Sequence, residues 1–306
     1  MTRYSSIDDL ELQGTWLAIG VFDGVHIGHQ VMLQKLSEGA QAENAPSAVL
    51  TFYPHPAVIL GKREEFKWLS PIDERTELIL NQGIDHVILQ EFDRKFANTT
   101  AETFMKHLSR KLGIRHLLVG RDFALGHKRE GDIPFLVEFG KKEGYEVHTI
   151  ETVSDNVGVI SSSLIRNLLH NGQVSEVKNK LGRPYALHGV VVHGDGRGRT
   201  INIPTANLQL PKDKLVPGNG VYACQAILGS VRKAAVTNIG TRPTFNSGEQ
   251  SVHVETHLFD HQQDMYGEIL KLEFVKRLRS EMRFPDVNAL LEQIHKDIRK
   301  ARSLLE

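Results

Sequence analysis

The chain has 306 residues, 40% of them hydrophobic, which is enough to bury one large core or two ordinary ones, and we expect two domains. Lysine plus arginine and aspartate plus glutamate number 37 each, so the net charge is zero and gives no global attraction for nucleic acid or an anionic membrane. The single cysteine, Cys224, excludes an internal disulfide framework and a multi-cysteine metal site, and it is typical of a reducing compartment.

The first residues and the apolar runs indicate no export and no membrane insertion. The start, "MTRYSSIDDLELQG", is polar and acidic and lacks the apolar core of a signal peptide. No later apolar run approaches the ~20 residues that span a bilayer. We therefore expect a soluble, cytoplasmic protein.

Short apolar runs alternate with segments of helical periodicity from residue 15 to about 151. The runs that we expect to be strands are "TWLAIGV", "SAVLTFY", "DHVILQ", "RHLLVG" and "YEVHTIE". Ser70-Pro71 and Thr100 are typical of helix N-caps, and Gly113 and Gly144 are typical of residues just past helix ends. Because strands joined by crossover helices form a parallel sheet, we predict an α/β domain with ligands beyond the carboxyl ends of its strands.

The pattern changes after Gly182. The following segments are short and β-rich, without helical crossovers: "ALHGVVVHG", "GVYACQAIL", "VRKAAVTNIG", "SVHVETHLF" and "EILKLEFVKRL". They predict an antiparallel barrel or sandwich, of which we favour the barrel. A final helix from about Pro285 should pack against it through one apolar stripe, formed by Val287, Leu290, Leu291, Ile294, Ile298 and Ala301. The predicted domains are residues 1–182 and 183–306.

A first candidate site lies in the turn between the first strand of this α/β pattern and the helix that follows it, in "AIGVFDGVHIGHQVMLQKL". Free backbone N–H groups at the start of a helix favour anions, and His26 and His29 can both face one oxyanion there. A phosphate site is therefore one hypothesis. A metal site and two incidental polar residues at a helix start are the alternatives, and the spacing of the histidines does not decide among them.

Four ordered motifs in the first half resemble one family. "GVFDGVHIGH" resembles the GxFDxxHxGH signature of nucleotidyltransferases, and "TFYPHP", "VGRDFALGHKREGD" and "ISSSLIRNLL" follow it in order. Together they look like the FMN adenylyltransferase module of the bacterial bifunctional riboflavin kinase/FAD synthetases, with "SSS" where that family usually has "SST". The resemblance implies a Rossmann-like nucleotidyltransferase domain.

The resemblance also implies roles for residues of these motifs. His26 and His29 would hold the ATP phosphates and stabilise the transition state, and Mg²⁺ would share the charge. The remaining residues of the ATP site would be Gly20, Phe22, Asp23, Ser162 and Arg166. The flavin site would include Phe52, Pro56, Asp122 and Phe123. Read without the resemblance, the same segments are also typical of a capped helix, a solvated loop and plain loop packing.

A second candidate site opens the β-rich region, in "HGDGRGRTINIPTANLQL". Its glycines permit close backbone approach and its arginines supply charge, a pattern that suits a phosphate-embracing loop formed by Gly194, Gly196, Arg197, Gly198 and Arg199. Thr205 and Asn207 carry hard oxygen ligands suited to Mg²⁺. The alternative is a strand leaving a turn.

Further motifs resemble the riboflavin kinase module of the same enzymes throughout residues 183–306. They are "PGNGVYA", "AVTNIGTRPTF", "VETHLFD", "DMYGEILKLEFVKRLRSEMRF" and "LLEQIHKDIRKA". The resemblance implies that Glu255 is the general base toward the ribityl 5'-hydroxyl, and that Asn207 also contacts ATP. A carboxylate within hydrogen-bond reach of an attacking hydroxyl can accept its proton. Asn202 stands where the family commonly has glycine, and we expect this difference to lower kinase efficiency slightly.

The leading hypothesis is a two-step enzyme. Riboflavin and ATP would give FMN in the second domain, and FMN and ATP would give FAD and pyrophosphate in the first. We expect small-molecule substrates only, at most transient self-association, and neither nucleic acid nor membrane as a partner. The alternatives are an adenylyl- or cytidylyltransferase with another substrate, and a module whose barrel and basic loop hold RNA, against which the zero net charge argues.

Overall fold

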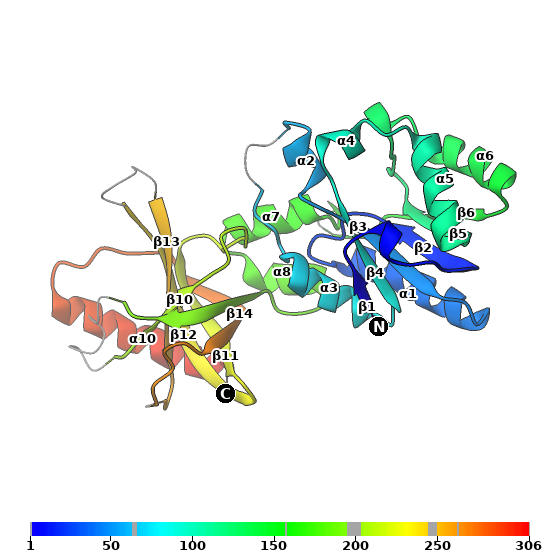
Figure 1. Ribbon diagram of the computed structural model, residues 1–306. Coiled ribbons are helices and arrows are strands. Elements are labelled where there is room, and N and C mark those ends of the chain that lie inside the picture. The colour runs from blue at the N-terminus through cyan, green and yellow to red at the C-terminus, as the bar shows by residue number, and fades with distance from the viewer. Residues whose placement is uncertain are drawn as a thin grey trace. The chain divides into compact units, whose positions relative to one another are not determined.

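A computed structural model describes residues 2–62, 66–156, 158–194, 203–243, 250–261 and 263–305 (Figure 1). The chain divides into two compact units, Met1–Ser162 and Ser163–Glu306. Among these residues, no helix combines the length and the apolar character that crossing a membrane requires.

The first unit contains a six-stranded sheet in the order β1-β4-β3-β2-β5-β6, and every paired strand is parallel. Its strands are β1 (Thr2–Tyr4), β2 (Thr15–Ile19), β3 (Ser47–Tyr53), β4 (His86–Glu91), β5 (Ile114–Gly120) and β6 (Glu146–Ile150). The α/β prediction is confirmed, with β1 as a strand that the periodicity did not indicate. Strand β2 lies between β3 and β5, so the chain order reverses beside it, and ligands bind at such reversal points beyond the carboxyl ends.

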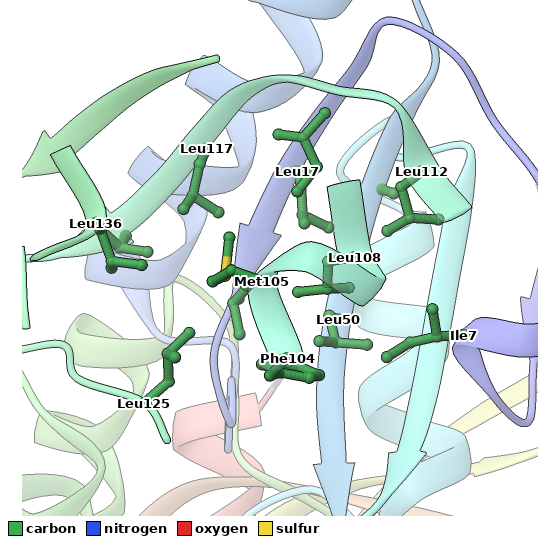
Figure 2. Packing of buried hydrophobic residues seen from close by; sticks show 14 of the residues in the cluster. Ile7, Leu17, Leu50, Phe104, Met105, Leu108, Leu112, Leu117, Leu125 and Leu136 are labelled. Carbon is green, nitrogen blue, oxygen red and sulfur yellow. The ribbon is translucent and has the colours of Figure 1, made fainter. Parts of the chain in front are cut away.

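Helices cover both faces of this sheet. They are α1 (Ile27–Ala42), α2 (Pro56–Ile59), α3 (Ile72–Leu80), α4 (Arg94–Ala97), α5 (Ala101–Leu112) and α6 (Ile133–Glu143). The same unit also contains 3₁₀ turns at Ile7–Asp9 and His127–Arg129 and a separate two-stranded ribbon of β7 (Ser154–Asp155) and β8 (Gly158–Val159). Figure 2 shows Phe104, Met105 and Leu108 of α5 packed among buried side chains of the sheet, including Leu17 and Leu50. The neighbouring positions, Ala18 and Val49, point to the other face, where α1 packs.

The predicted helix boundaries hold with one exception. Thr100 caps α5 by accepting a hydrogen bond from the Thr103 N–H at 3.2 Å, and Gly113 and Gly144 end α5 and α6 with positive φ values of 49° and 83°. The prediction that Ser70 caps α3 is wrong. The N-cap position of α3 is Pro71, without a side-chain cap, because the Ser70 hydroxyl is used elsewhere as a hydrogen-bond acceptor.

The second unit is a closed antiparallel barrel in the order β10-β13-β12-β11-β14-β9. Its strands are β9 (Ala186–Val192), β10 (Ala206–Gln209), β11 (Gly220–Leu228), β12 (Val231–Pro243), β13 (Gln250–Leu258) and β14 (Ile269–Arg279). The barrel, rather than the sandwich, is therefore confirmed. Strand β10, within "PTANLQL", closes the barrel by pairing with both β9 and β13.

The terminal helix, α10 (Val287–Leu305), packs on the outer wall of the barrel against β11, β12 and β14. Ala301 is fully buried there and Ile298 contacts the same apolar cluster, as predicted. The prediction is wrong for Val287, which is 58% exposed. It is the first residue of the helix, and Leu290 and Ile294 of the same stripe line a cavity.

Two helices precede the barrel, α7 (Ser162–His170) and α8 (Val174–Leu181). The Gly218 N–H donates to the Leu169 carbonyl at 2.8 Å, and the Ser175 hydroxyl donates to the Val275 carbonyl at 3.0 Å. These bonds explain why backbone contacts divide the chain at 162–163, whereas the change from helix to strand in the sequence lies near 182.

Candidate active sites

The turn after β2 has an unusual backbone. Phe22, Gly24 and Val25 have positive φ values of 53°, 82° and 39°, and a β-branched residue such as Val25 rarely adopts this conformation. Two side chains donate to the Val21 carbonyl: the Thr51 hydroxyl at 3.0 Å and the Arg75 guanidinium at 2.9 Å. Strained backbone that several neighbours hold in place is typical of a functional site.

Asp23 connects this turn to the segment before α3. Its carboxylate is buried and accepts hydrogen bonds from the Leu69 N–H at 3.3 Å and the Ser70 N–H at 3.2 Å. The Ser70 hydroxyl in turn accepts from the Gly24 N–H at 2.9 Å. The structure thus places the Asp23 carboxylate on backbone N–H groups, where it positions the turn.

The two histidines of this turn lie together. His26 is the N-cap of α1, and its Nδ1 accepts a hydrogen bond from the His29 N–H at 3.4 Å. The two imidazole rings are stacked, with centroids 3.7 Å apart and an angle of 20° between their planes. His29 Nδ1 is buried and makes no hydrogen bond to any described residue, and such a buried polar atom is a candidate contact for a ligand.

Burial, reinforced by His26 and then by Arg75, holds the pKa of His29 well below its ordinary value. The ring is therefore neutral at pH 7. Each of these causes disfavours a positive charge on the ring, and an anion bound beside it would have the opposite effect.

The same pKa shift predicts a pH dependence of stability. Below pH 6.5 His29 takes up a proton in the unfolded chain but not in the folded chain. The contribution of His29 to the free energy of unfolding is therefore complete above pH 6.5 and is lost as the pH falls toward the pKa of the folded state. We expect the free energy of unfolding of wild type to fall more steeply between pH 7.5 and 5.5 than that of His29→Asn, by up to about 1.4 kcal/mol per pH unit. Both tryptophans, Trp16 and Trp68, lie in the first unit, so urea titration followed by tryptophan fluorescence measures it. Equal slopes in the two proteins would contradict the assignment.

Arg75 is the buried support of the turn, and the sequence did not reveal it. Its guanidinium is fully buried, donates to the Val21 carbonyl and to the Phe52 carbonyl at 3.3 Å, and lies 4.2 Å from the centroid of the Trp68 ring. One guanidinium thus ties α3 to the ends of β2 and β3. A lone arginine within a helix gives no sequence signal for such a role.

Arg75→Leu is expected to destabilise the first unit by about 3 kcal/mol or more, because two carbonyls lose hydrogen bonds from a charged donor. Urea unfolding followed by tryptophan fluorescence measures the loss. The matched control is Arg121→Leu, since Arg121 is exposed and pairs only at the surface with Glu151, and it should change stability by no more than about 0.5 kcal/mol. A similar, small effect of both substitutions would show that Arg75 does not support the turn.

The predicted ATP-site residues on α7 are placed differently from one another. The Ser162 hydroxyl donates to the Asp23 carbonyl at 2.9 Å, so it belongs to the turn described above. Arg166 follows one turn later on α7, in the second unit. Gly20 faces the ring of Phe22, because a Cβ added to it would lie 3.0 Å from that ring.

The predicted flavin residues lie at the end of β3 or shortly after the ends of β3 and β5. Phe52 is nearly enclosed in the core, with its ring centroid 5.7 Å from that of Phe92, and Phe123 is partly buried against the same core. Pro56 begins α2, and Asp122 is exposed, its carbonyl accepting a hydrogen bond from Arg129 at 2.8 Å.

A cluster of rings that sequence reasoning only partly anticipated lies beside "TFYPHP". His55 stacks on Phe66 with centroids 3.8 Å apart, and Phe66 meets Trp68 edge-on at 4.7 Å. Tyr53 stacks at 6.1 Å on Trp68 and is 39% exposed. Among the aromatic side chains of this strand end, Tyr53 thus offers more open surface than Phe52.

A cavity of about 320 Å³ lies between the outer wall of the barrel and α10. It brings together Thr205 and Glu255, which the sequence placed in two separate motifs. Its other polar residues are Asn238, His257, Arg279, Glu281 and Asp297, and its apolar wall includes Met282, Phe284, Leu290 and Ile294. A carboxylate, a hydroxyl and an apolar wall in one cavity can hold a planar ring system and a polar chain.

Strand register positions Glu255. It is directly opposite Asn207 of β10 and Asn238 of β12, and residues directly opposite in an antiparallel pair share one face. The sequence alone left open which face of β13 Glu255 occupies. Closure of the barrel decides it, because Val254 and Thr256 are buried on the other face.

Asn207 lies against Gly194. A Cβ at Gly194 would be 2.1 Å from Asn207 Nδ2, so this position requires glycine while the amide keeps its place. The other predicted loop residues, Gly196, Arg197, Gly198 and Arg199, lie outside the described residues, as does Asn202.

Arg279 and Asp297 close one side of the cavity, and neither was predicted from the sequence. Asp297 is buried and accepts hydrogen bonds from Arg279 Nε at 2.9 Å and Gln293 Nε2 at 3.0 Å. This ion pair joins α10 to β14. The sequence did contain one indication of this pair: Asp297, a charged residue, lies on the same face of the helix as the predicted apolar stripe.

Comparisons with known proteins agree for both halves. Two family models match the chain: FAD synthetase over residues 8–164 and riboflavin kinase over residues 181–305. The bifunctional riboflavin kinase/FMN adenylyltransferase of Bacillus subtilis (strain 168) is 36% identical over 288 residues, which are 93% of this chain and 90% of that protein. The protein of the same description from Escherichia coli (strain K12) is 37% identical over 292 residues, covering 95% and 92%. A crystal structure of a macrolide-efflux protein from Streptococcus pneumoniae superimposes with a TM-score of 0.89, at 29% identity and 98% coverage of each chain.

Proposed function

The chain belongs to the family of bifunctional riboflavin kinase/FMN adenylyltransferases, and we propose that the turn after β2 and the cavity beside α10 divide its two reactions between them. The riboflavin kinase activity makes FMN, and the FMN adenylyltransferase activity makes FAD. The adenylyltransferase would occupy residues 1–182 and the kinase residues 183–306. The stacked pair of His26 and His29 carries the first assignment, and the shared cavity of Thr205 and Glu255 carries the second.

For FAD formation, a phosphate oxygen of FMN attacks the α-phosphorus of ATP, and pyrophosphate leaves. No side chain needs to form a covalent bond, so the protein's contribution is orientation and electrostatic stabilisation. The N-terminus of α1 offers backbone N–H groups, and His26 and His29 stand at that terminus. Their hydrogen bonds would strengthen as charge develops on the phosphoryl oxygens. Gly20, Phe22, Asp23 and Ser162 would shape this turn, and Arg166 would contact the outer phosphates.

The flavin of FMN would lie at the ends of β3 and β5, where Phe52, Pro56, Asp122 and Phe123 are found. The open ring of Tyr53 supports an aromatic contact at this place. Beyond the predicted residues, Trp68 would hold that ring in position.

For FMN formation, Glu255 would accept the proton of the riboflavin 5'-hydroxyl while the hydroxyl oxygen attacks the γ-phosphorus of ATP and ADP leaves. The apolar wall from α10 suits the isoalloxazine ring, and the carboxylate lies in the same cavity. Gly194 and Asn207, with the loop residues Gly196, Arg197, Gly198 and Arg199, would contact ATP.

Thr205 and Asn207 are suited to hold Mg²⁺ beside the phosphates. The fit rests on donor chemistry: a hydroxyl and an amide oxygen, both hard ligands, stand near a carboxylate on one face of the barrel. The ion, when bound, would share the negative charge of the triphosphate.

Purified protein incubated with riboflavin, ATP and Mg²⁺ tests the whole assignment. Chromatography should show FMN first and then FAD, and the same protein given FMN and ATP should release one pyrophosphate for each FAD. Absence of both flavin products would overturn the proposal. A cytoplasmic location, which the single cysteine supports, also belongs to this proposal.

A further inference from the structure

A second cluster of histidines lies in the first unit, away from the turn after β2. His116 of β5 and His148 and Glu146 of β6 offer ligand atoms that all lie within 4.8 Å of one another. His116 is near the start of β5, whereas the His26–His29 pair follows the carboxyl end of β2. Because all strands of the sheet are parallel, the cluster lies nearer the amino ends of the strands, whereas the turn after β2 lies at their carboxyl ends. We therefore assign it no part in the reactions proposed above.

The distances in this cluster suit one metal ion. His116 Nδ1 and His148 Nε2 are 3.0 Å apart, and Glu146 Oε2 is 3.7 Å from each of them. Zinc binds imidazole nitrogen and carboxylate oxygen at about 2.0–2.2 Å, so ligands of one tetrahedral ion are about 3.3 Å apart. Shifts of a few tenths of an ångström would bring the three atoms onto one cation.

Neighbouring residues hold His116 in the orientation that a metal ligand needs. The carboxylate of Glu43, at the end of α1, lies 3.2 Å from His116 Nε2, the nitrogen on the far side of the ring from the cluster. A carboxylate there favours the proton on Nε2 and leaves Nδ1 as a lone-pair donor, which is the common arrangement behind metal-binding histidines. The Trp16 indole N–H donates to the same carboxylate at 3.3 Å.

The packing around Trp16 gives this arrangement little freedom. The Trp16 ring lies over His116 with centroids 4.0 Å apart. Trp16 itself fits against Gly39 of α1, where a Cβ would be 2.2 Å from the indole ring. His116 is therefore confined between a ring on one side and a carboxylate at one end, while the side chains of His148 and Glu146, 39% and 74% exposed, leave the cluster open to solvent.

We propose that His116, Glu146 and His148 form a binding site for one first-row divalent transition metal ion, with Glu43 as the positioning residue of His116. Two imidazoles and one carboxylate favour Zn²⁺, Co²⁺, Ni²⁺ or Cu²⁺ over Mg²⁺, which prefers oxygen ligands only. Three protein ligands leave a coordination position for water. A bound ion would link β5 to the edge strand β6.

Cobalt titration of the full chain, without nucleotide or flavin, tests this site. Co²⁺ is expected to give the visible absorption of a low-coordinate ion, saturating at one equivalent, and Zn²⁺ should abolish it while excess Mg²⁺ should not. Zn²⁺ at 100-fold excess over its dissociation constant should raise the melting temperature of the first unit by about 5 to 10 °C. Absence of a saturable Co²⁺ spectrum would overturn the proposal.

Variants assign the ligands. His148→Ala should lose the Co²⁺ spectrum and the Zn²⁺-induced rise in melting temperature, and the half-exposed position of His148 lets the variant fold. Glu43→Gln should keep the site but weaken affinity about 10- to 100-fold. The control is His295→Ala, an exposed histidine of α10, which should bind Co²⁺ as the wild type does. Equal binding by His148→Ala and the wild type would overturn the assignment.

Discussion

Replacement of His29 by alanine is expected to lower kcat for FAD formation by about 10²- to 10³-fold, the cost of removing one preorganised hydrogen bond to a developing oxyanion. The ring stacks on His26, its Nδ1 is buried, and the backbone turn that carries it is held by residues of β3 and α3. Because the imidazole is already held in place, it needs little rearrangement when charge develops on the phosphoryl oxygens.

The measurement is initial rates of FAD release from FMN and ATP, with FMN formation from riboflavin measured on the same preparation. The kinase rate serves as an internal control for folding of the other unit, and His295→Ala controls for loss of a histidine in itself. His29→Ala must also show the wild-type tryptophan fluorescence. Undiminished FAD formation by a folded His29→Ala protein would remove this residue from the mechanism.

Glu255→Gln is expected to lower the rate of FMN formation by about 10²- to 10⁴-fold, the range that a general base contributes. Glutamine keeps the shape and the cross-strand position opposite Asn207 and Asn238 but cannot accept a proton. The loss should therefore appear in kcat, with little change in the KM for riboflavin.

Measuring both reactions distinguishes loss of the general base in Glu255→Gln from a general loss of structure. Glu255→Gln supplied with FMN and ATP should form FAD at the wild-type rate, because that reaction is assigned to the other unit. Glu268→Gln, at an exposed position between β13 and β14, is the matched control and should retain both rates. A Glu255→Gln protein with normal FMN formation would assign the base to another group of the cavity.

Local patterns in the sequence predicted local structure well. The cap at Thr100, the glycines at 113 and 144 and the strand and helix rhythm depend on contacts between residues a few positions apart, which a sequence displays directly. Ser70 was assigned wrongly because its hydroxyl is used by a residue 46 positions away, and a capping pattern contains no information on such a partner.

By itself, the sequence determined the family and both activities through its ordered motifs, and the α/β and barrel architecture through the pattern of apolar runs and β-rich segments. Each of these signals depends on residue types at short spacing. The tertiary structure decided which groups meet. Arg75 beneath the turn after β2, Glu255 and Thr205 in one cavity, and His116 beside His148 all join residues far apart in the chain. Strand order, barrel closure and burial bring these side chains together, and those are properties of packing that no short stretch of sequence specifies.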